Sequence, residues 1–142
     1  MAKKIILDCD PGNDDALGII VALGSDSLSL QAVTTGAGHL ANDRTFKNAC
    51  ITIAQIGEFN IPVSKGAENP LVRDRLIAKV LDLNSGLDPD RNDLNSIKPD
   101  SRNSVQLLYD TIIDNPGITI VTTGPLTNLA ILFNLYPSLD NS

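Results

Sequence analysis

The sequence contains no tryptophan, one histidine and two cysteines, and aromatic residues make up only 4% of it. Two cysteines are too few for the disulfide framework that stabilises small secreted domains. No apolar run reaches the roughly 18 residues of a transmembrane helix. Only three apolar residues follow the N-terminal lysines, too few for the apolar region of a signal peptide. We therefore expect reduced thiols and a cytoplasmic location.

Positive charge is also scarce. The chain has 11 Lys and Arg against 17 Asp and Glu, which gives a formal net charge of −6. Nucleic acids and anionic membranes attract surfaces rich in Lys and Arg, so this balance argues against both as partners. The hydrophobic fraction of 42% is enough for a core, and 142 residues is the length of one ordinary domain.

Short apolar runs alternate with segments of helical periodicity. Strands are predicted at 3–7, 28–35, 61–63 and 118–121, and helices at 13–24, 41–56, 105–113 and 126–135. Pro125 is expected in the first turn of the last helix. Residues 82–100, rich in Asp and Asn, are predicted to form a loop. The alternation predicts an α/β fold, with an open, mostly parallel sheet, helices on both faces and a Rossmann-like core.

Four acidic residues cluster where the first predicted strand ends: Asp8, Asp10, Asp14 and Asp15, in the sequence DCDPGNDD. Asp8 and Asp10 are two apart, so they point to one face of the strand and Cys9 points to the other. These carboxylates repel one another unless a cation is present, and hard oxygen ligands suit Ca²⁺ or Mg²⁺. Asp14 and Asp15 could instead only complement the positive end of the first helix, with Asn13 as its cap. That alternative leaves two acids at the end of a buried strand unexplained.

Two further strands end in the same tripeptide, Thr34-Thr35-Gly36 and Thr122-Thr123-Gly124. The carboxyl ends of parallel strands form the ligand crevice of an open sheet, so both segments are expected beside the aspartates. Alternatively, each segment simply turns a strand into a loop. His39 follows the first of them and is a candidate acid or ligand-binding group, unless it is merely exposed. Cys9 and Cys50 are expected in the core.

The segment DCDPGNDDA, residues 8–16, resembles the signature of the inosine–uridine preferring nucleoside hydrolases. The resemblance continues in order through LQAVTTGAGH, the Asn48-Ala49 pair, IPVSKGAENPLV and VTTGPLTNLA, over nearly the whole chain. It implies calcium-dependent hydrolysis of the N-glycosidic bond of a ribonucleoside to ribose and free base. Preference for purine or pyrimidine nucleosides stays open.

The resemblance also implies roles for individual residues. Asp10 and Asp15 would bind Ca²⁺ through their carboxylates, and Thr123 through its main-chain carbonyl. Asp10 would also be the catalytic general base towards a calcium-bound water, and Asp14 would hold the ribose hydroxyls. His39 stands where the family commonly has a ribose-binding asparagine, which makes it a candidate substrate-binding residue.

Asp8 is expected to support these groups from behind, without contacting the ligand. Family members are considerably longer than this chain, and their C-terminal half supplies the remaining calcium, ribose and leaving-group residues. The resemblance therefore implies that residues 1–142 form the N-terminal part of one truncated α/β domain. Little or no turnover is expected from these residues alone. A homo-oligomer or a complementary C-terminal chain is expected to cover the exposed faces.

Two other interpretations stay open. Haloacid-dehalogenase-like phosphatases also place an Asp-x-Asp motif at the end of the first strand, where it binds Mg²⁺, and Asp8-Cys9-Asp10 fits that motif. Those enzymes usually continue differently after the second aspartate, and they need a later lysine, whereas no lysine follows Lys98. The other interpretation is a folded fragment that catalyses nothing.

Overall fold

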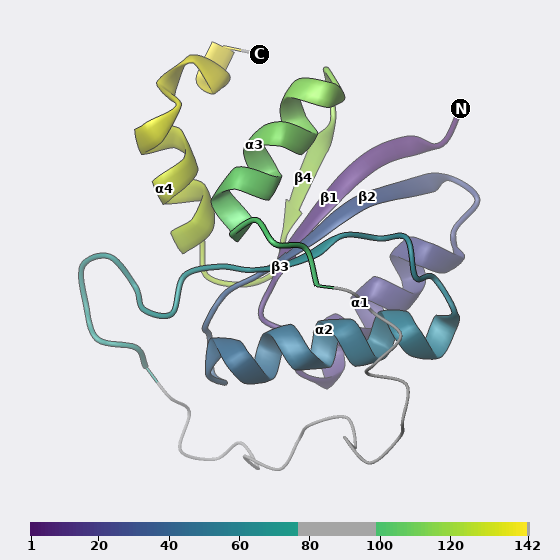
Figure 1. Ribbon diagram of the computed structural model, residues 1–142, viewed down its shortest axis with the longest axis horizontal. Coiled ribbons are helices and arrows are strands. Elements are labelled where there is room, and N and C mark those ends of the chain that lie inside the picture. Colours follow the sequence, from purple (N-terminus) through teal and green to yellow (C-terminus); the bar gives the residue numbers. More distant parts are fainter. Residues whose placement is uncertain (77–98, 142) are drawn as a thin grey trace.

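The computed structural model describes residues 1–76 and 99–141, and this part of the chain contains one parallel sheet (Figure 1). The strands are β1 (Lys3–Cys9), β2 (Leu28–Thr35), β3 (Val63–Lys65) and β4 (Thr119–Thr122), in the spatial order β3-β2-β1-β4. All three pairings are parallel, and β1 lies between β2 and β4. The predicted α/β fold with a parallel sheet is confirmed.

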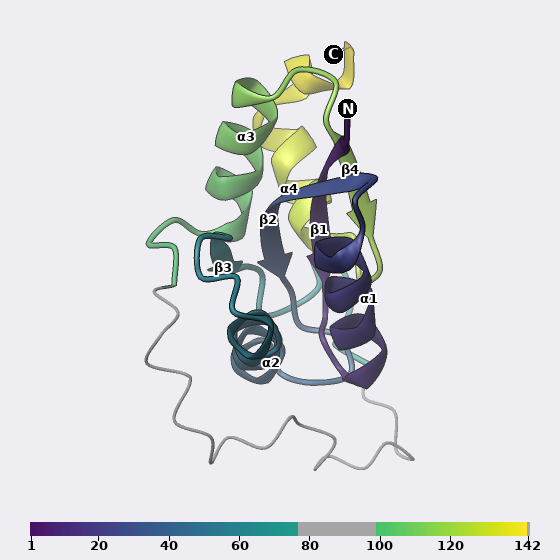
Figure 2. The ribbon, with the colours of Figure 1, turned by 90° about the vertical axis from the view of Figure 1, so that its right-hand side faces the viewer.

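The helices cover both faces of this sheet, as predicted (Figure 2). They are α1 (Asn13–Gly24), α2 (Asn42–Ile56), α3 (Ser104–Asp114) and α4 (Thr127–Leu135), followed by a 3₁₀ turn at Pro137–Asn141. The core between the sheet and the pair α1 and α2 is separate from the core between the sheet and the pair α3 and α4.

The apolar run in β1 is continuous because the strand is covered on both faces. Ile5, Leu7 and Cys9 pack in the core beneath α1 and α2, whereas Ile6 packs against α3 and α4. A strand buried on both faces needs apolar residues at every position, not at alternate ones. Asp8 is also buried, with 1% of its surface exposed. An acidic residue at this depth needs hydrogen-bond partners, and these turn out to lie beneath the candidate site.

Most predicted boundaries agree with the structure to within two residues, and three details were wrong. β3 begins at Val63, because Pro62 has no N–H to donate to the neighbouring strand. The N-cap of α1 is Gly12, not Asn13, because Gly12 has the extended conformation of a cap and Asn13 is already helical. Pro125 precedes the N-cap of α4, where its carbonyl accepts a hydrogen bond of 2.8 Å from the Thr127 N–H.

The predicted loop and the two cysteines can also be compared with the structure. Residues 77–98, which include most of the loop predicted at 82–100, lie outside the described part of the chain. Asp100, at the end of that loop, forms an ion pair of 2.7 Å with Arg102. Cys9 and Cys50 are free and buried in the core, as predicted. In the described residues, no helix has both the length and the apolar character required to cross a membrane.

Candidate functional site

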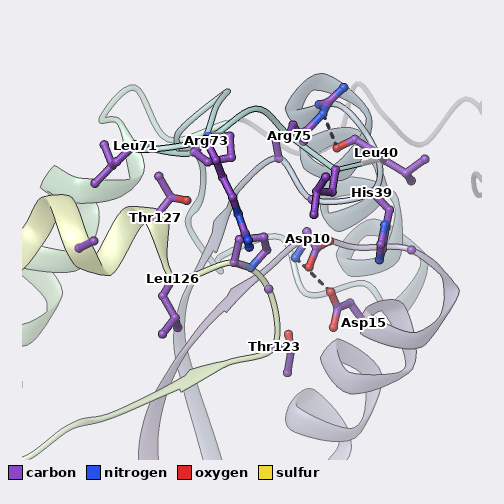
Figure 3. Close-up of a pocket in the computed structure, with 18 of the residues that line it drawn as sticks. Asp10, Asp15, His39, Leu40, Leu71, Arg73, Arg75, Thr123, Leu126 and Thr127 are labelled. Atoms are coloured by element: carbon purple, nitrogen blue, oxygen red, sulfur yellow. Dashed lines mark hydrogen bonds between the residues drawn. The ribbon is translucent and has the colours of Figure 1, made fainter. Parts of the chain in front are cut away.

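A cavity of about 1020 Å³ opens at the carboxyl edge of the sheet (Figure 3). Four segments supply most of its lining: residues 10–15 after β1, 37–40 after β2, 70–76 after β3 and 123–127 after β4. Parallel strands direct all of their C-terminal loops to the same edge, so residues more than 100 positions apart meet here.

The cavity gathers most of the residues singled out in the sequence. Asp10, Asp14, Asp15, His39 and Thr123 all line it. Figure 3 shows Asp10 and Asp15 beside each other, with His39 on the same side of the cavity. The acidic cluster of the first strand and the threonine that follows the fourth strand therefore border one space, which is large enough for a small ligand.

Asp10 is the most perturbed of the acidic groups that line the cavity. Its backbone N–H donates a hydrogen bond of 3.0 Å to Asp15 Oδ2. Burial raises the pKa of Asp10 to about 6, and the charges of Asp15 and Asp14 act in the same direction. A hydrogen bond from the His39 backbone and the charge of His39 oppose this rise. The site therefore holds a carboxylate whose proton affinity suits acid–base chemistry near neutral pH.

Two glycines let the backbone approach the Asp10 carboxylate closely. A Cβ atom at Gly38 would lie 1.7 Å from Asp10 Oδ2, and one at Gly124 would lie 2.6 Å from Asp10 Oδ1. Real Cβ atoms do not approach an oxygen so closely, so any side chain here would displace the carboxylate. The glycine of the second TTG segment is thus needed for contact with Asp10, while Gly36 of the first makes only an ordinary contact at 3.6 Å with Asn128.

Both TTG segments lie beside aspartates, as predicted, but only the second one lines the cavity. Thr123 and Gly124 line the cavity, whereas Thr34 and Thr35 are fully buried and do not. The Thr34 hydroxyl donates a hydrogen bond of 2.6 Å to Asp8 Oδ1. The first segment belongs to an interior strand and satisfies buried polar groups there, so it supports the site from inside.

Asp8 lies behind the cavity and does not line it. Besides Thr34, its Oδ1 accepts a hydrogen bond of 2.8 Å from Asn128 Nδ2. Asn128 Nδ2 also donates to the Thr35 carbonyl, and Asn128 Oδ1 accepts a bond of 2.9 Å from the Ala67 N–H. Burial raises the pKa of Asp8, and the two side-chain hydrogen bonds lower it. Asn128 therefore joins β1, β2, α4 and the segment after β3 directly beneath the site.

Sequence reasoning gave no role to Asn128 or to three residues of α2. Asn48 Nδ2 donates to the Pro11 carbonyl at 2.8 Å, which fixes the turn that carries the aspartates. The Thr45 hydroxyl donates to the Gly36 carbonyl at 2.9 Å, and Asn42 Nδ2 donates to the Gly66 carbonyl at 2.6 Å. Polar residues within an amphipathic helix look solvent-exposed in a sequence. The hints otherwise were the family resemblance at Asn48 and in the segment VTTGPLTNLA, which contains Asn128.

The donor set around Asp10 partly fits a calcium ion. Asp10, Asp15 and the Thr123 main chain offer hard oxygen atoms, which Ca²⁺ prefers. A cation would relieve the mutual repulsion of the carboxylates, which adds to burial in raising the pKa of Asp10. Within residues 1–76 and 99–141, however, no three His, Cys, Asp or Glu side chains form a metal-binding group. Calcium usually takes about 6–8 oxygen ligands, so the described residues supply only part of a site.

Removing the Asp10 charge is expected to stabilise the fold at neutral pH. The folded-state pKa of about 6 lies above the ordinary value of 3.8, so folding favours the protonated form. This contribution to stability is complete below about pH 4 and is lost as the pH rises through about 6. With a chelator present, Asp10→Asn should raise the free energy of unfolding by about 1–2 kcal/mol at neutral pH. Urea denaturation across this pH range measures the difference.

Asp26→Asn is the matched control, because it removes the same charge from an exposed turn before β2. It should change stability by less than about 0.5 kcal/mol at every pH. An Asp10→Asn variant that is less stable than the wild type at neutral pH would contradict the electrostatic description of the site.

The family model, curated relatives and solved structures that match this chain are nucleoside hydrolases. The family model described as "Inosine-uridine preferring nucleoside hydrolase" matches residues 5–142. Two curated relatives are named pyrimidine-specific ribonucleoside hydrolase RihA. The one from Shewanella woodyi is 42% identical and the match covers 100% of this chain and 46% of the relative. The one from Citrobacter koseri is 41% identical, with coverages of 98% and 45%.

Solved structures also match nearly the whole of this chain with less than half of their own length. A plant nucleoside hydrolase, PpNRh1, superposes with a TM-score of 0.83 at 34% identity, over 97% of this chain and 44% of that one. An inosine-guanosine nucleoside hydrolase shares the fold with a TM-score of 0.78 at 22% identity, over 98% of this chain and 43% of that one. The chain thus spans about half the length of the relatives it matches.

Proposed function

The chain belongs to the inosine–uridine preferring nucleoside hydrolase family, and we propose that it supplies the water-activating part of a site that hydrolyses ribonucleosides to ribose and free base. The observation that carries this proposal is the cavity that brings Asp10, Asp14, Asp15 and Thr123 together. Membership of this family also decides against a haloacid-dehalogenase-like phosphatase.

Asp10 is proposed as the general base. Its raised pKa, about 6, gives the carboxylate enough proton affinity to accept a proton from the attacking water while it remains ionised at neutral pH. Asp14 lines the same cavity and is proposed to hold the ribose hydroxyls. Together the carboxylates favour the positive charge that develops on the sugar as the glycosidic bond breaks.

Calcium is the proposed cofactor, held by the carboxylates of Asp10 and Asp15 and by the main-chain carbonyl of Thr123. When bound, the ion would supply Lewis-acid assistance by lowering the pKa of the attacking water. We propose that binding to residues 1–142 is weak, because affinity falls with the number of charged ligands and two carboxylates are few for this ion.

The proposed substrates include pyrimidine ribonucleosides, since the relatives at 41–42% identity are named pyrimidine-specific. His39 lines the cavity beside Asp10 and is proposed to contact the substrate. Its position on the side of the carboxylates favours a contact with the ribose over one with the base.

A second copy of the chain or a complementary chain is the proposed partner. Leu17, Ile20 and Val21 on α1 are exposed, and such apolar surface is commonly covered by another polypeptide. Sedimentation of the purified protein would detect such an assembly, and a monomer would contradict self-association.

The proposed location is the cytoplasm, because buried, free thiols suit a reducing compartment. Cell fractionation would test this location.

Ribose release from uridine and inosine, with and without added calcium, tests the proposed function. We expect residues 1–142 alone to give a slow, calcium-dependent rate, well below the ~1–10³ s⁻¹ of typical enzymes. The leaving base has little help, and general acid assistance alone is worth about 10²–10⁴-fold. Asp10→Ala should remove the calcium-dependent rate entirely, because it removes both the base and a metal ligand.

Two results would contradict this proposal. A rate that survives Asp10→Ala would show that another group activates water. A rate within the range of typical enzymes would show that the residues present are already sufficient, so that the site is not partial.

A further inference from the structure

The cavity is lined by charged residues of both signs. Asp10, Asp14 and Asp15 lie in the segment after β1, whereas Arg73 and Arg75 lie in the segment 70–76 that forms another part of the lining. Figure 3 shows the Arg73 side chain extending from this segment into the cavity, towards the side where Asp10 and Thr123 lie. A chain with only 11 basic residues places two of them here.

The two arginines are not equivalent. Arg75 Nη1 donates a hydrogen bond of 3.4 Å to the Leu40 carbonyl, which draws its guanidinium towards the loop after β2. Every ion pair in the described part of the chain involves Lys65 or Arg102, so Arg73 has no carboxylate partner there. The Arg73 guanidinium is therefore free to interact with whatever occupies the cavity.

Hydrolysis of a nucleoside creates a matching separation of charge. The C1′–N bond breaks and its electron pair stays on the base nitrogen. The water oxygen bonds to C1′, and the proton of the water passes to the Asp10 carboxylate. In the transition state the sugar is thus positive and the base is negative. Groups that are already oriented towards these developing charges lower the barrier.

Resting on the proposed function, we propose that Arg73, which reaches into the cavity from the segment after β3, stabilises the negative charge on the departing base. The guanidinium stays charged throughout the working pH range, so it acts electrostatically and donates no proton. The base anion then takes its proton from solvent water.

Binding of base anions tests this inference without requiring turnover. The probes are 5-nitrouracil, which is anionic at neutral pH, and uracil, which is neutral. Calorimetric titrations at physiological ionic strength screen diffuse charge effects. We expect the protein to bind the anion at least about 10-fold more tightly than uracil. Arg73→Gln should reduce this preference to within about 2-fold, because it removes the fixed charge and keeps a polar side chain.

Arg75→Gln is the matched control, because it removes the same charge two residues away. It should leave the preference for the anion intact. Equal losses in both variants would assign the preference to the overall field of the segment and overturn the inference. An absence of preference in the wild type would overturn it as well.

A parallel titration with ribose and calcium tests the proposed function separately. Failure of ribose to bind would contradict that function, whatever the result with the base anions.

Discussion

Asn128→Ala is expected to lower the free energy of unfolding by about 3–5 kcal/mol. The substitution removes hydrogen bonds to Asp8, to the Thr35 carbonyl and from the Ala67 N–H. It also leaves the carboxylate of Asp8, which is 1% exposed, with Thr34 as its one remaining side-chain partner. Losing one partner of a buried charged group is costly because water cannot replace it. Urea denaturation measures the loss.

Asn134→Ala is the matched control in the same helix. Asn134 is exposed, and its side chain makes one hydrogen bond, to the Ala130 carbonyl. Its replacement should cost less than about 1 kcal/mol. Similar costs for the two variants would show that the network around Asp8 contributes little to stability.

Gly38→Ala is expected to weaken calcium binding by about 10–100-fold and to lower the stability of the fold moderately. The new Cβ would lie 1.7 Å from Asp10 Oδ2 and 2.9 Å from Asp10 Cβ. Rotation of the carboxylate relieves the first contact but not the second, so one of the two loops must also shift, at a cost to stability of about 1–3 kcal/mol. Calorimetry with calcium measures the first effect, and thermal unfolding measures the second.

Gly18→Ala is the control for this substitution, because a Cβ at Gly18 meets nothing within 4 Å. In the interior of α1 it should stabilise the fold by about 0.5–1 kcal/mol and leave calcium binding unchanged. If Gly38→Ala bound calcium as tightly as the wild type, the position of the Asp10 carboxylate would be unimportant for binding.

The order of strands and helices could be predicted because local signals determine it. Apolar runs followed by turn residues predicted β1 and β2, and helical periodicity with a glycine stop predicted α2, whose C-cap Gly57 has a positive φ of 86°. The position of the aspartates at the carboxyl edge followed from the same reasoning, because a parallel sheet places every C-terminal loop on one edge. Residues adjacent in sequence were therefore placed well.

Contacts between distant residues could not be predicted in the same way. Asn128 and Asp8 are 120 positions apart, and nothing in the local sequence of either residue identifies the other as its partner. The distance between Gly38 and Asp10 depends on how two loops pack, and so does the entry of Arg73 into the cavity. The two TTG segments could not be told apart from their sequence either, because the tripeptides are identical. Their surroundings differ because β2 is an interior strand and β4 is at the edge of the described sheet.

The most direct test of the central claim is a calorimetric titration of calcium into the wild-type protein and into Asp10→Asn. We expect weak binding by the wild type, which thermal unfolding also detects as stabilisation. We expect no binding by Asp10→Asn, although that variant is the more stable of the two without calcium. Equal binding by both proteins, or no binding by either, would contradict the claim that the carboxylates at the end of β1 form a cation-dependent site.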